Sequence, residues 1–414
     1  MRKLLFLLLA AAVSASAQTA SSSLPDGTHW VGSWASSQQI PEPSNTLPAA
    51  DLTDATMRQI VHLSLGGQQV RIRLSNVFGT QPLTFTSVHI AEAVSPASSA
   101  IVPATDTEVT FGGQPGVTLP AGAEYVSDPI QFDVKPLSNL AITFHLDQPP
   151  ARETSHPGSR TTTYYVHGDQ VSAPELKGAG TVEHWFDISG VEVAAPQKAS
   201  CIVALGDSIT DGHASGTNKN HRWTDYLAER LQASRKTRDL CVLNEGIGGN
   251  RILRYGLGPA AIARVDRDVL AQPGARTVIL LEGINDIGVL GLDKNATPAD
   301  HHALVEQIIE ADRQIIALAH AHGLRVLGGT IMPFTGSDYY HPGAQGEADR
   351  EAVNGWIRTP GHFDGVIDFD RIMRDPADPH RLNPAYDSGD HLHPGPAGYK
   401  AMADAIPVKL LEAR

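Results

Sequence analysis

Three residues of the sequence could together activate a nucleophile: Ser208, Asp390 and His393. A serine hydroxyl is a weak nucleophile until a neighbouring base takes its proton, and an imidazole can be that base when a carboxylate orients it. Asp390 precedes His393 by three residues, so one turn of chain or a tight loop can bring both side chains to one site. The alternative is a solvated loop rich in Asp and His. We predict Ser208 as nucleophile, His393 as general base and Asp390 as the orienting group.

Ser208 belongs to the first of four short segments in the C-terminal half of the chain. The first three each follow an apolar run, and the fourth lies near the end of the sequence. They are Gly206-Asp207-Ser208, Asn244-x-Gly246-x-x-Gly249, Gly283-Ile284-Asn285-Asp286 and Asp390-His391-Leu392-His393. In this order they resemble the GDS, glycine, GxND and DxxH blocks of the SGNH (GDSL) hydrolase family, with no departure at the catalytic positions. The resemblance implies a serine hydrolase that forms an acyl-enzyme.

Acyl transfer generates an oxyanion, which hydrogen-bond donors must stabilise. The candidate donors are the backbone N–H of Ser208 at a helix start, the backbone N–H of Gly249 in the glycine block, and the side-chain amide of Asn285. Two of them have a local alternative, because serine is a favoured helix N-cap and asparagine a common turn residue. We assign all three to the oxyanion hole because they accompany a nucleophile, a base and an orienting carboxylate.

Other polar and aromatic residues near these segments are given structural roles. Asp207 and Asp286 are adjacent to site residues and are expected to bond turn backbone or neighbouring helices. Trp223 is expected to pack in the core, and His391 to face away from the site that holds His393. Thr210 stands where the second glycine of G-x-S-x-G would be, which argues against an α/β-hydrolase elbow at this serine.

The elements that must hold the site residues are those of an α/β domain over residues 199–414. Apolar runs typical of buried parallel strands alternate there with helical patterns. Strands are expected at 201–205, 241–244, 277–281, 324–330 and 365–368, and helices at about 222–233, 259–271, 301–322 and 396–412. The alternation predicts a three-layer SGNH-type fold, with a parallel sheet between helices. Ser208 would lie at the carboxyl end of a central strand, where open α/β sheets bind ligands.

Residues 18–195 carry no catalytic motif and predict a separate all-β domain. Residues 18–50 are rich in Ser, Pro and Gln, and their beginning is expected to be irregular. From about 56 to 194, short alternating runs such as Val70 to Leu74 are separated by Gly and Pro, which predicts a β-sandwich or jelly-roll. A linker is expected at 194–198.

The β domain could bind carbohydrate or only shape one wall of the cleft. We favour the second role, because aromatic residues fit half-buried sheets. The aromatic residues that could stack on sugars are Trp30, Trp34, Tyr164, Tyr165 and Trp185.

The first 17 residues read as a secretory signal. Met1-Arg2-Lys3 precedes an apolar run over residues 4–13 and the small residues Ala15-Ser16-Ala17. The run is shorter than the roughly 20 residues of a membrane-spanning helix. We therefore expect a secreted or periplasmic protein with no membrane span. The formal net charge of −13 argues against nucleic acid as a partner, since sequence-independent binding to nucleic acid needs positive charge.

Two cysteines, Cys201 and Cys241, each open an expected strand. If the strands are neighbours, the cysteines could form a disulfide, which an exported protein permits; two buried free thiols are the alternative. No metal site is expected, because neither the cysteines nor the histidine groups have the spacing of a known motif. The histidine groups are His301-His302 and His320-x-His322. No cofactor is expected either.

The layout of the whole chain, a β domain before an SGNH domain, resembles secreted carbohydrate-esterase and arylesterase-like members of the family. This resemblance implies hydrolysis of short acyl esters, acetyl above all, on plant polysaccharides or aryl alcohols. The alternatives are a lysophospholipase-like or thioesterase-like hydrolase of the same fold, and a non-catalytic glycan-binding protein. The last of these would be expected to lack Ser208 or His393, and both are present.

Overall fold

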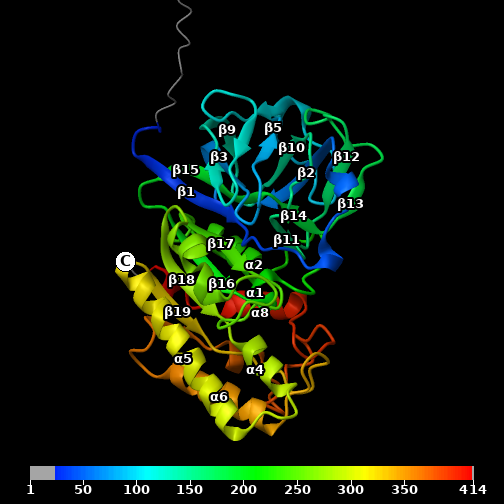
Figure 1. The fold of residues 1–414 in the computed structure, drawn as a ribbon. Coiled ribbons are helices and arrows are strands. Elements are labelled where there is room, and N and C mark those ends of the chain that lie inside the picture. Colours follow the sequence, from blue (N-terminus) through cyan, green and yellow to red (C-terminus); the bar gives the residue numbers. More distant parts are fainter. Residues whose placement is uncertain (1–23, 413–414) are drawn as a thin grey trace, which may run out of the picture.

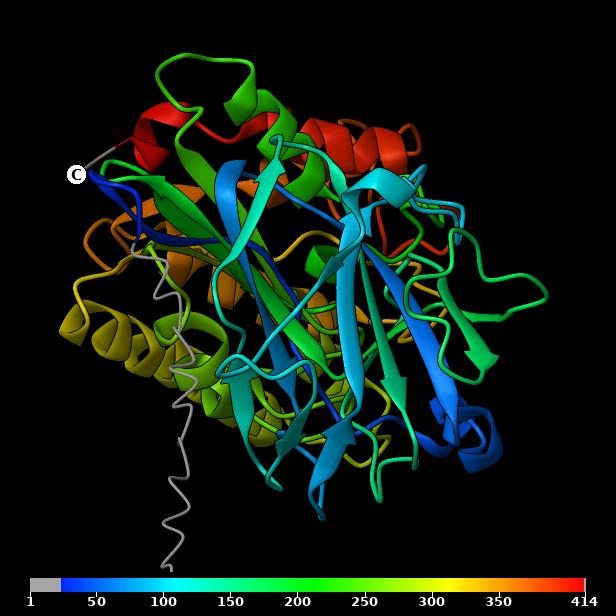
Figure 2. The same ribbon diagram turned by 90° about the horizontal axis from the view of Figure 1, so that it is seen from above.

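The computed structural model describes residues 24–412 (Figure 1). The signal sequence predicted for residues 1–17 lies outside the described residues. Antiparallel strands occupy the upper half of Figure 1, and a parallel sheet with helices occupies the lower half. Seen from above, the antiparallel part lies over the other, with the helices behind it (Figure 2). This confirms the predicted fold class, an α/β sheet preceded by a β domain.

Two antiparallel sheets form the N-terminal part of the molecule, and they share one hydrophobic core. The first has the order β1-β15-β3-β8, with β9 also paired to β3. Its strands are β1 (Thr28–Ala35), β15 (Ile188–Pro196), β3 (Gly67–Ser75), β8 (Glu124–Val126) and β9 (Ile130–Val134). The second has the order β13-β12-β2-β10-β5-β6. Its strands are β13 (Gly180–Val182), β12 (Thr163–His167), β2 (Ala55–His62), β10 (Asn139–Leu146), β5 (Ser87–Glu92) and β6 (Thr107–Glu108).

The sequence pattern of β9 illustrates why these segments form strands. Ile130, Phe132 and Val134 are buried, whereas the residues between them are exposed. Successive side chains of a strand point to opposite faces, so this alternation places one face on the core and the other in solvent. Two short ribbons complete this part. They are β4 (Leu83–Phe85) with β7 (Val117–Leu119), and β11 (Ser155–Pro157) with β14 (His184–Phe186).

The segment predicted as a linker, residues 194–198, is mostly strand. β15 continues to Pro196 because Ala194 and Ala195 pair with Trp30 and His29 of β1. Only residues 197–199 separate β15 from the first parallel strand, which begins at Ser200. β1 itself falls within residues 18–50, where no strand was expected. The domain boundaries drawn at 195 and 199 stay a prediction.

The C-terminal part is a five-stranded parallel sheet of order β17-β16-β18-β19-β20. Its strands are β16 (Ser200–Gly206), β17 (Leu240–Gly246), β18 (Ala275–Leu281), β19 (Arg325–Gly329) and β20 (Gly365–Ile367). β16 and β18 are near-continuous apolar runs, as strands covered on both faces require. Cys201 and Cys241 are register partners on β16 and β17 and are joined by a disulfide, with Cα atoms 4.6 Å apart.

The helices agree with the predicted ones in the long amphipathic segments and differ in the short ones. α2 (Trp223–Gln232) packs on α8 (Pro396–Ala405), and α5 (Pro298–Ala321) packs on β19 and on α6 (Ala344–Arg358). The helix expected at 259–271 is α3 (Ala261–Val265) followed by a π-helical turn (Asp266–Leu270). The helix expected at 396–412 ends before Pro407, which cannot donate a backbone hydrogen bond, and α9 (Val408–Leu411) follows.

Three helices were not predicted: α4 (Ile284–Gly291), α6 and α7 (Phe369–Met373). α4 is short and contains Gly288 and Gly291, and α6 is largely polar and contains Gly346 and Gly355, so both carry residues that disfavour a helix. α7 has only five residues. Within residues 24–412, no helix has the length and apolar character that a membrane span requires.

β1 joins the two parts of the molecule. It lies against β17, and Gly32 comes so close that a Cβ there would stand 2.8 Å from Leu243 Cδ1. The Ser64 hydroxyl accepts a hydrogen bond from the Val242 backbone N–H at 3.1 Å. Buried residues of both parts belong to one continuous hydrophobic cluster, so the β domain covers one edge of the parallel sheet rather than being tethered beside it.

Candidate active site

The predicted site residues gather at the carboxyl edge of the parallel sheet. β16 lies between β17 and β18. Ser208 begins the helix after β16, Gly249 lies in the loop after β17, and Asn285 lies in the first turn of the helix after β18. The order β17-β16-β18 makes this a topological switch point, because the chain runs to opposite sides of β16 in its next two strands. Open α/β sheets bind ligands at such points. The fourth segment, residues 390–393, reaches the same edge from the loop before α8.

Ser208 is the first residue of a one-turn helix, α1 (Ser208–Asp211). The preceding residue, Asp207, caps this helix: its carboxylate accepts a hydrogen bond from the Ile209 backbone N–H at 2.9 Å. Ser208 is therefore not the N-cap, which was the structural alternative for it, and its hydroxyl is available for another partner. That partner is His393 Nε2, 2.8 Å from Ser208 Oγ.

His393 is held by Asp390 on its other side. Asp390 Oδ2 lies 2.6 Å from His393 Nδ1, and Oδ1 accepts backbone N–H bonds from Leu392 and His393 at 3.0 and 2.8 Å. A carboxylate can only accept, so Nδ1 carries the proton and Nε2 of the neutral ring accepts from the serine hydroxyl. Partial burial would raise the pKa of Asp390, but the hydrogen bonds from His393 outweigh it and hold that pKa well below its usual range.

His391 points elsewhere, as predicted from its position between the two. Its ring is exposed, and its Nδ1 lies 2.5 Å from Asp387 Oδ2. The backbone of His391 has a φ of +59°, the left-handed region, so consecutive side chains in this loop do not follow a helical path. This local turn separates the two histidines and directs only His393 toward Ser208.

Two of the predicted oxyanion donors are backbone groups without an acceptor. No atom of residues 24–412 accepts a hydrogen bond from the N–H of Ser208 or of Gly249. Gly249 has a φ of +71°, and a Cβ at this position would stand 2.3 Å from Leu257 Cδ1. The left-handed conformation disfavours a side chain here, and a Cβ would also displace the tip of the exposed Leu257 side chain. An unpaired N–H at the edge of the site is what a developing oxyanion requires.

The third predicted donor, Asn285, is almost fully buried and its orientation is fixed. The Tyr340 hydroxyl donates to its Oδ1 at 2.6 Å, and its Nδ2 donates to the Asn250 carbonyl at 2.7 Å. The amide nitrogen keeps one further N–H. Burial raises the pKa of Tyr340 to about 12, so this hydroxyl keeps its proton and remains a donor. Tyr340 was not predicted, and only the structure shows that it orients the amide.

Arg264 ties the strand ends together beneath the site. Its guanidinium donates to the carbonyls of Gly206 and Glu245, at the carboxyl ends of β16 and β17, at 2.9 and 2.6 Å. It also bonds Asn250 Oδ1 at 2.9 Å and Ser37 Oγ of the β domain at 2.8 Å. Sequence analysis missed Arg264 because these partners are backbone carbonyls or polar side chains distant in the sequence, which leave no local pattern.

Asp207 and Asp286 bond turn backbone, as predicted. Asp286 accepts from the N–H groups of Ile252 and Leu253 at 2.9 and 3.2 Å, which fixes the loop that follows Gly249. Burial raises the pKa of Asp207 to about 7 and that of Asp286 to about 6. Trp223 is fully buried and packs near Phe369, which confirms its predicted packing role.

Two aromatic rings enclose His393. The ring of His213 lies over it with centroids 4.1 Å apart, and Tyr339 meets it edge-on at 5.6 Å. Neither residue was predicted to belong to the site. The sequence feature that could have pointed to His213 is its position five residues after Ser208.

The group His213, Asp390 and His393 brings three ligand-type atoms within 4.8 Å, but these atoms already bond one another and their neighbours. We assign no metal there, and the expectation of no metal stays a prediction.

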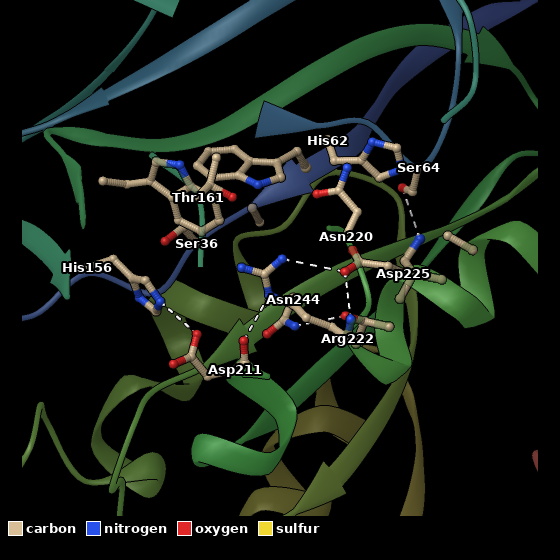
Figure 3. A pocket seen from close by; sticks show the side chains of 16 residues that line it. Ser36, His62, Ser64, His156, Thr161, Asp211, Asn220, Arg222, Asp225 and Asn244 are labelled. Carbon is tan, nitrogen blue, oxygen red and sulfur yellow. Dashed lines mark hydrogen bonds and ion pairs between the residues drawn. The ribbon is translucent and has the colours of Figure 1, made fainter. Parts of the chain in front are cut away.

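A cavity of about 40 Å³ lies between the two parts of the molecule (Figure 3). Trp34, Trp185 and His156 of the β domain line one side, and Asp211 and Arg222 line the other. The cavity contains none of the five predicted site residues. Its size suits a few water molecules rather than an ester substrate.

Comparison with known proteins identifies the C-terminal half. Residues 204–401 match the model of the GDSL-like lipase/acylhydrolase family. Similar solved structures include an acetylxylan esterase from Geobacillus stearothermophilus (21% identity, 51% of this chain and 95% of that chain, TM-score 0.38). They also include the aryl esterase of M. smegmatis (16%, 51% and 99%, TM-score 0.36) and a GDSL-like lipase from Bacteroides thetaiotaomicron VPI-5482 (19%, 52% and 89%, TM-score 0.37). No curated protein matches the sequence. Residues 204–401 are thus a domain of the GDSL-like lipase/acylhydrolase family, which supports a carboxylic ester hydrolase.

Proposed function

We propose that the protein is a serine esterase in which Ser208, His393 and Asp390 form the catalytic triad. The observation that carries this proposal is the unbroken hydrogen-bond chain from Ser208 Oγ through the His393 ring to Asp390, with distances of 2.8 and 2.6 Å. It starts at a buried helix N-terminus, beside two backbone N–H groups that have no acceptor within residues 24–412.

The reaction follows from this geometry. Ser208 Oγ attacks the acyl carbon while its proton passes to His393 Nε2, and Asp390 stabilises the resulting imidazolium. The tetrahedral oxyanion takes hydrogen bonds from the Ser208 and Gly249 N–H groups and from the Asn285 amide. His393 then gives its proton to the alcohol oxygen as the C–O bond breaks, which leaves an acyl ester on Ser208. Water, activated by the same imidazole, repeats the sequence and releases the acid.

The proposed substrates are short acyl esters, mainly acetyl, of plant polysaccharides or aryl alcohols. The ring of Tyr339 supports a cyclic alcohol, because it is 51% exposed and stands edge-on to His393, the residue that must protonate the leaving alcohol. An exposed aromatic ring offers an apolar face for a sugar or aryl ring to stack on. The β domain, in this proposal, shapes the cleft and does not bind glycan by itself.

A chain-length series of p-nitrophenyl esters, together with acetate release from acetylated xylan and pectin, tests this function. We expect the highest kcat/KM at two to four acyl carbons. Activity that rises toward long acyl chains would overturn the substrate class and favour a lysophospholipase-like enzyme, and preference for acyl thioesters would favour a thioesterase. Tyr339→Ala should raise KM for acetylated glycans more than it raises KM for a small alkyl ester. The exposed Tyr255 is a matched control.

We also propose that the protein is exported and acts outside the cytoplasm. The tripartite sequence of residues 1–17 supports this, and a disulfide between Cys201 and Cys241 suits an oxidising compartment. Fractionation of the producing cell and sequencing of the mature N-terminus test the proposal. A mature chain that begins near residue 18 is expected; an unprocessed chain in the cytoplasm would contradict it.

A further inference from the structure

We propose that Arg160 of the β domain is a positioning residue of the active site, and that it acts on the catalytic base through His213. This inference rests on the proposed function, because it concerns the same Ser208–His393–Asp390 triad. It gives the β domain a specific part in the reaction in addition to covering the sheet.

The loop between β11 and β12 carries Arg160, and polar contacts fix it to the segment that follows the nucleophile. His156 on β11 places Nε2 2.9 Å from Asp211 Oδ1, and its Nδ1 donates to the Ser37 carbonyl (Figure 3). Arg222 bridges the two parts by donating to the carbonyls of Asp211 and Ser159. Asp211 is the last residue of α1, so these contacts hold the β domain one helical turn from Ser208.

The backbone around Arg160 is equally well fixed. Its carbonyl accepts from the Asn218 N–H at 2.8 Å, and the Asn218 side chain bonds both the N–H and the hydroxyl of Thr162 at 2.8 Å. Arg160 itself has a φ of +52°, which is uncommon for a residue with a Cβ. Left-handed conformations of this kind persist only where the surroundings impose them. Here the surroundings direct the guanidinium toward the active site.

That guanidinium fixes the tautomer of His213. Arg160 Nη2 lies 3.2 Å from His213 Nδ1, and a guanidinium can only donate, so Nδ1 accepts and the ring proton is on Nε2. Nε2 faces Asp390 Oδ2 at 3.9 Å. The backbone of His213 is fixed too. Its N–H donates to the Ser208 carbonyl at 2.9 Å, and the His213 carbonyl accepts from the Tyr399 hydroxyl at 2.6 Å.

His213 in turn confines the catalytic base. Its ring covers one face of His393, with a tilt of 37°, and Tyr339 stands against the same imidazole at 90°. The ring of His393 must keep its orientation while its proton moves from Ser208 to the leaving alcohol, and a fixed neighbouring ring limits its rotation. Loss of Arg160 would release His213 and widen the range of orientations open to His393.

Arg160 also sets the charge beside the base. The groups that face His213 are Arg160 from the β domain, Asp211 from α1, Asp390 and His393 from the terminal loop, and Tyr339. Burial, together with the positive charges of His393 and Arg160, lowers the pKa of His213 to about 4. His213 therefore stays neutral while His393 gains and loses its proton. A neutral residue at 160 would favour protonation of His213 at higher pH.

The test measures the second-order rate of serine labelling by a fluorophosphonate from pH 5 to 9, since this rate reports the activated hydroxyl without substrate binding. The variant Arg160→Gln should be labelled about tenfold more slowly than wild type. The fall of its labelling rate toward acidic pH, the acidic limb of the pH profile, should occur at higher pH than in wild type. Arg160→Lys, which keeps the charge, should keep the limb in place. Arg152→Gln is the matched control, because Arg152 is exposed in the same domain and, within residues 24–412, bonds only the carbonyl of Phe78. Thermal unfolding of each variant reports its folding.

His213→Phe makes the test specific to the route through His213. Phenylalanine keeps a stacked ring but cannot accept from Arg160, so adding Arg160→Gln to it should change neither the rate nor the acidic limb further. Additive losses in the double variant, or an unmoved limb in Arg160→Gln, would overturn the inference. Ser208→Ala separates the two proposals: if it is not labelled while Arg160→Gln behaves as wild type, only the inference fails. If Ser208→Ala is labelled as fast as wild type, the proposed function fails.

Discussion

The two sides of the active site differ in how they are built. On the sheet side, Ser208, Gly249 and Asn285 each follow a strand directly, so their positions depend on the short stretch of chain before them. On the β-domain side, His156 and Arg160 reach the site through contacts that span more than 50 residues of sequence. In the proposed mechanism, the sheet side supplies the reacting groups and the β-domain side holds them in place. The comparison teaches that a domain without a motif can still belong to an active site.

The largest effect is expected on the sheet side. Ser208→Ala removes the nucleophile and should lower kcat by about 10⁴-fold or more, as the loss of a triad nucleophile does in serine hydrolases. The fold should be intact, because Asp207 and not Ser208 caps α1. Steady-state hydrolysis of p-nitrophenyl acetate and far-UV circular dichroism check both statements. Wild-type turnover by this variant would remove the sheet side from the chemistry.

A smaller loss on the same side is expected for Asn285→Ala. Removal of one oxyanion donor costs about 2.7–4 kcal/mol of transition-state stabilisation, so kcat should fall by about 10²–10³-fold with KM little changed. Tyr340→Phe, which removes the hydroxyl that orients the amide, should reduce kcat in the same direction by less. A rise in KM at constant kcat would show instead that Asn285 binds substrate in the ground state.

On the β-domain side, the corresponding loss should appear first in stability. His156→Ala leaves the carboxylate of Asp211 buried without its closest partner, and breaking a buried ion pair from one side costs about 3–5 kcal/mol. Urea denaturation should show a lower free energy of unfolding, and labelling of Ser208 should slow because α1 loses its contact with the β domain. An unchanged free energy of unfolding would mean that the two parts are coupled elsewhere.

The smallest effect concerns a buried acid of α5 that belongs to neither side. Burial, with a contribution from Asp286, raises the pKa of Asp312 to about 8, so its ionisation destabilises the fold as pH rises from about 4 to about 8. Asp312→Asn should be more stable than wild type at pH 8 and about equally stable near pH 4. Thermal unfolding at the two pH values measures this. A gain that is the same at both would contradict the shift in pKa.

Sequence patterns predicted the parallel sheet and the positions of the reacting groups because each group adjoins an apolar strand or a four-residue segment. They could not predict the partners of Arg264, since the carbonyls of Gly206 and Glu245 look like any others in a sequence. Tyr340 and His213 were missed for a similar reason, because their roles arise from loops that meet only in the fold. β1 was missed because its partner, β15, lies more than 150 residues away.

The central claim is that the imidazole of the terminal loop activates the hydroxyl after β16. The most direct measurement compares His393→Ala with its neighbour His391→Ala, by the rate at which a fluorophosphonate modifies the protein and by peptide mapping of the adduct. The account predicts an adduct on Ser208, a rate at least 10³-fold lower in His393→Ala, and a wild-type rate in His391→Ala. An adduct on another residue, or equal rates in the two histidine variants, would contradict it.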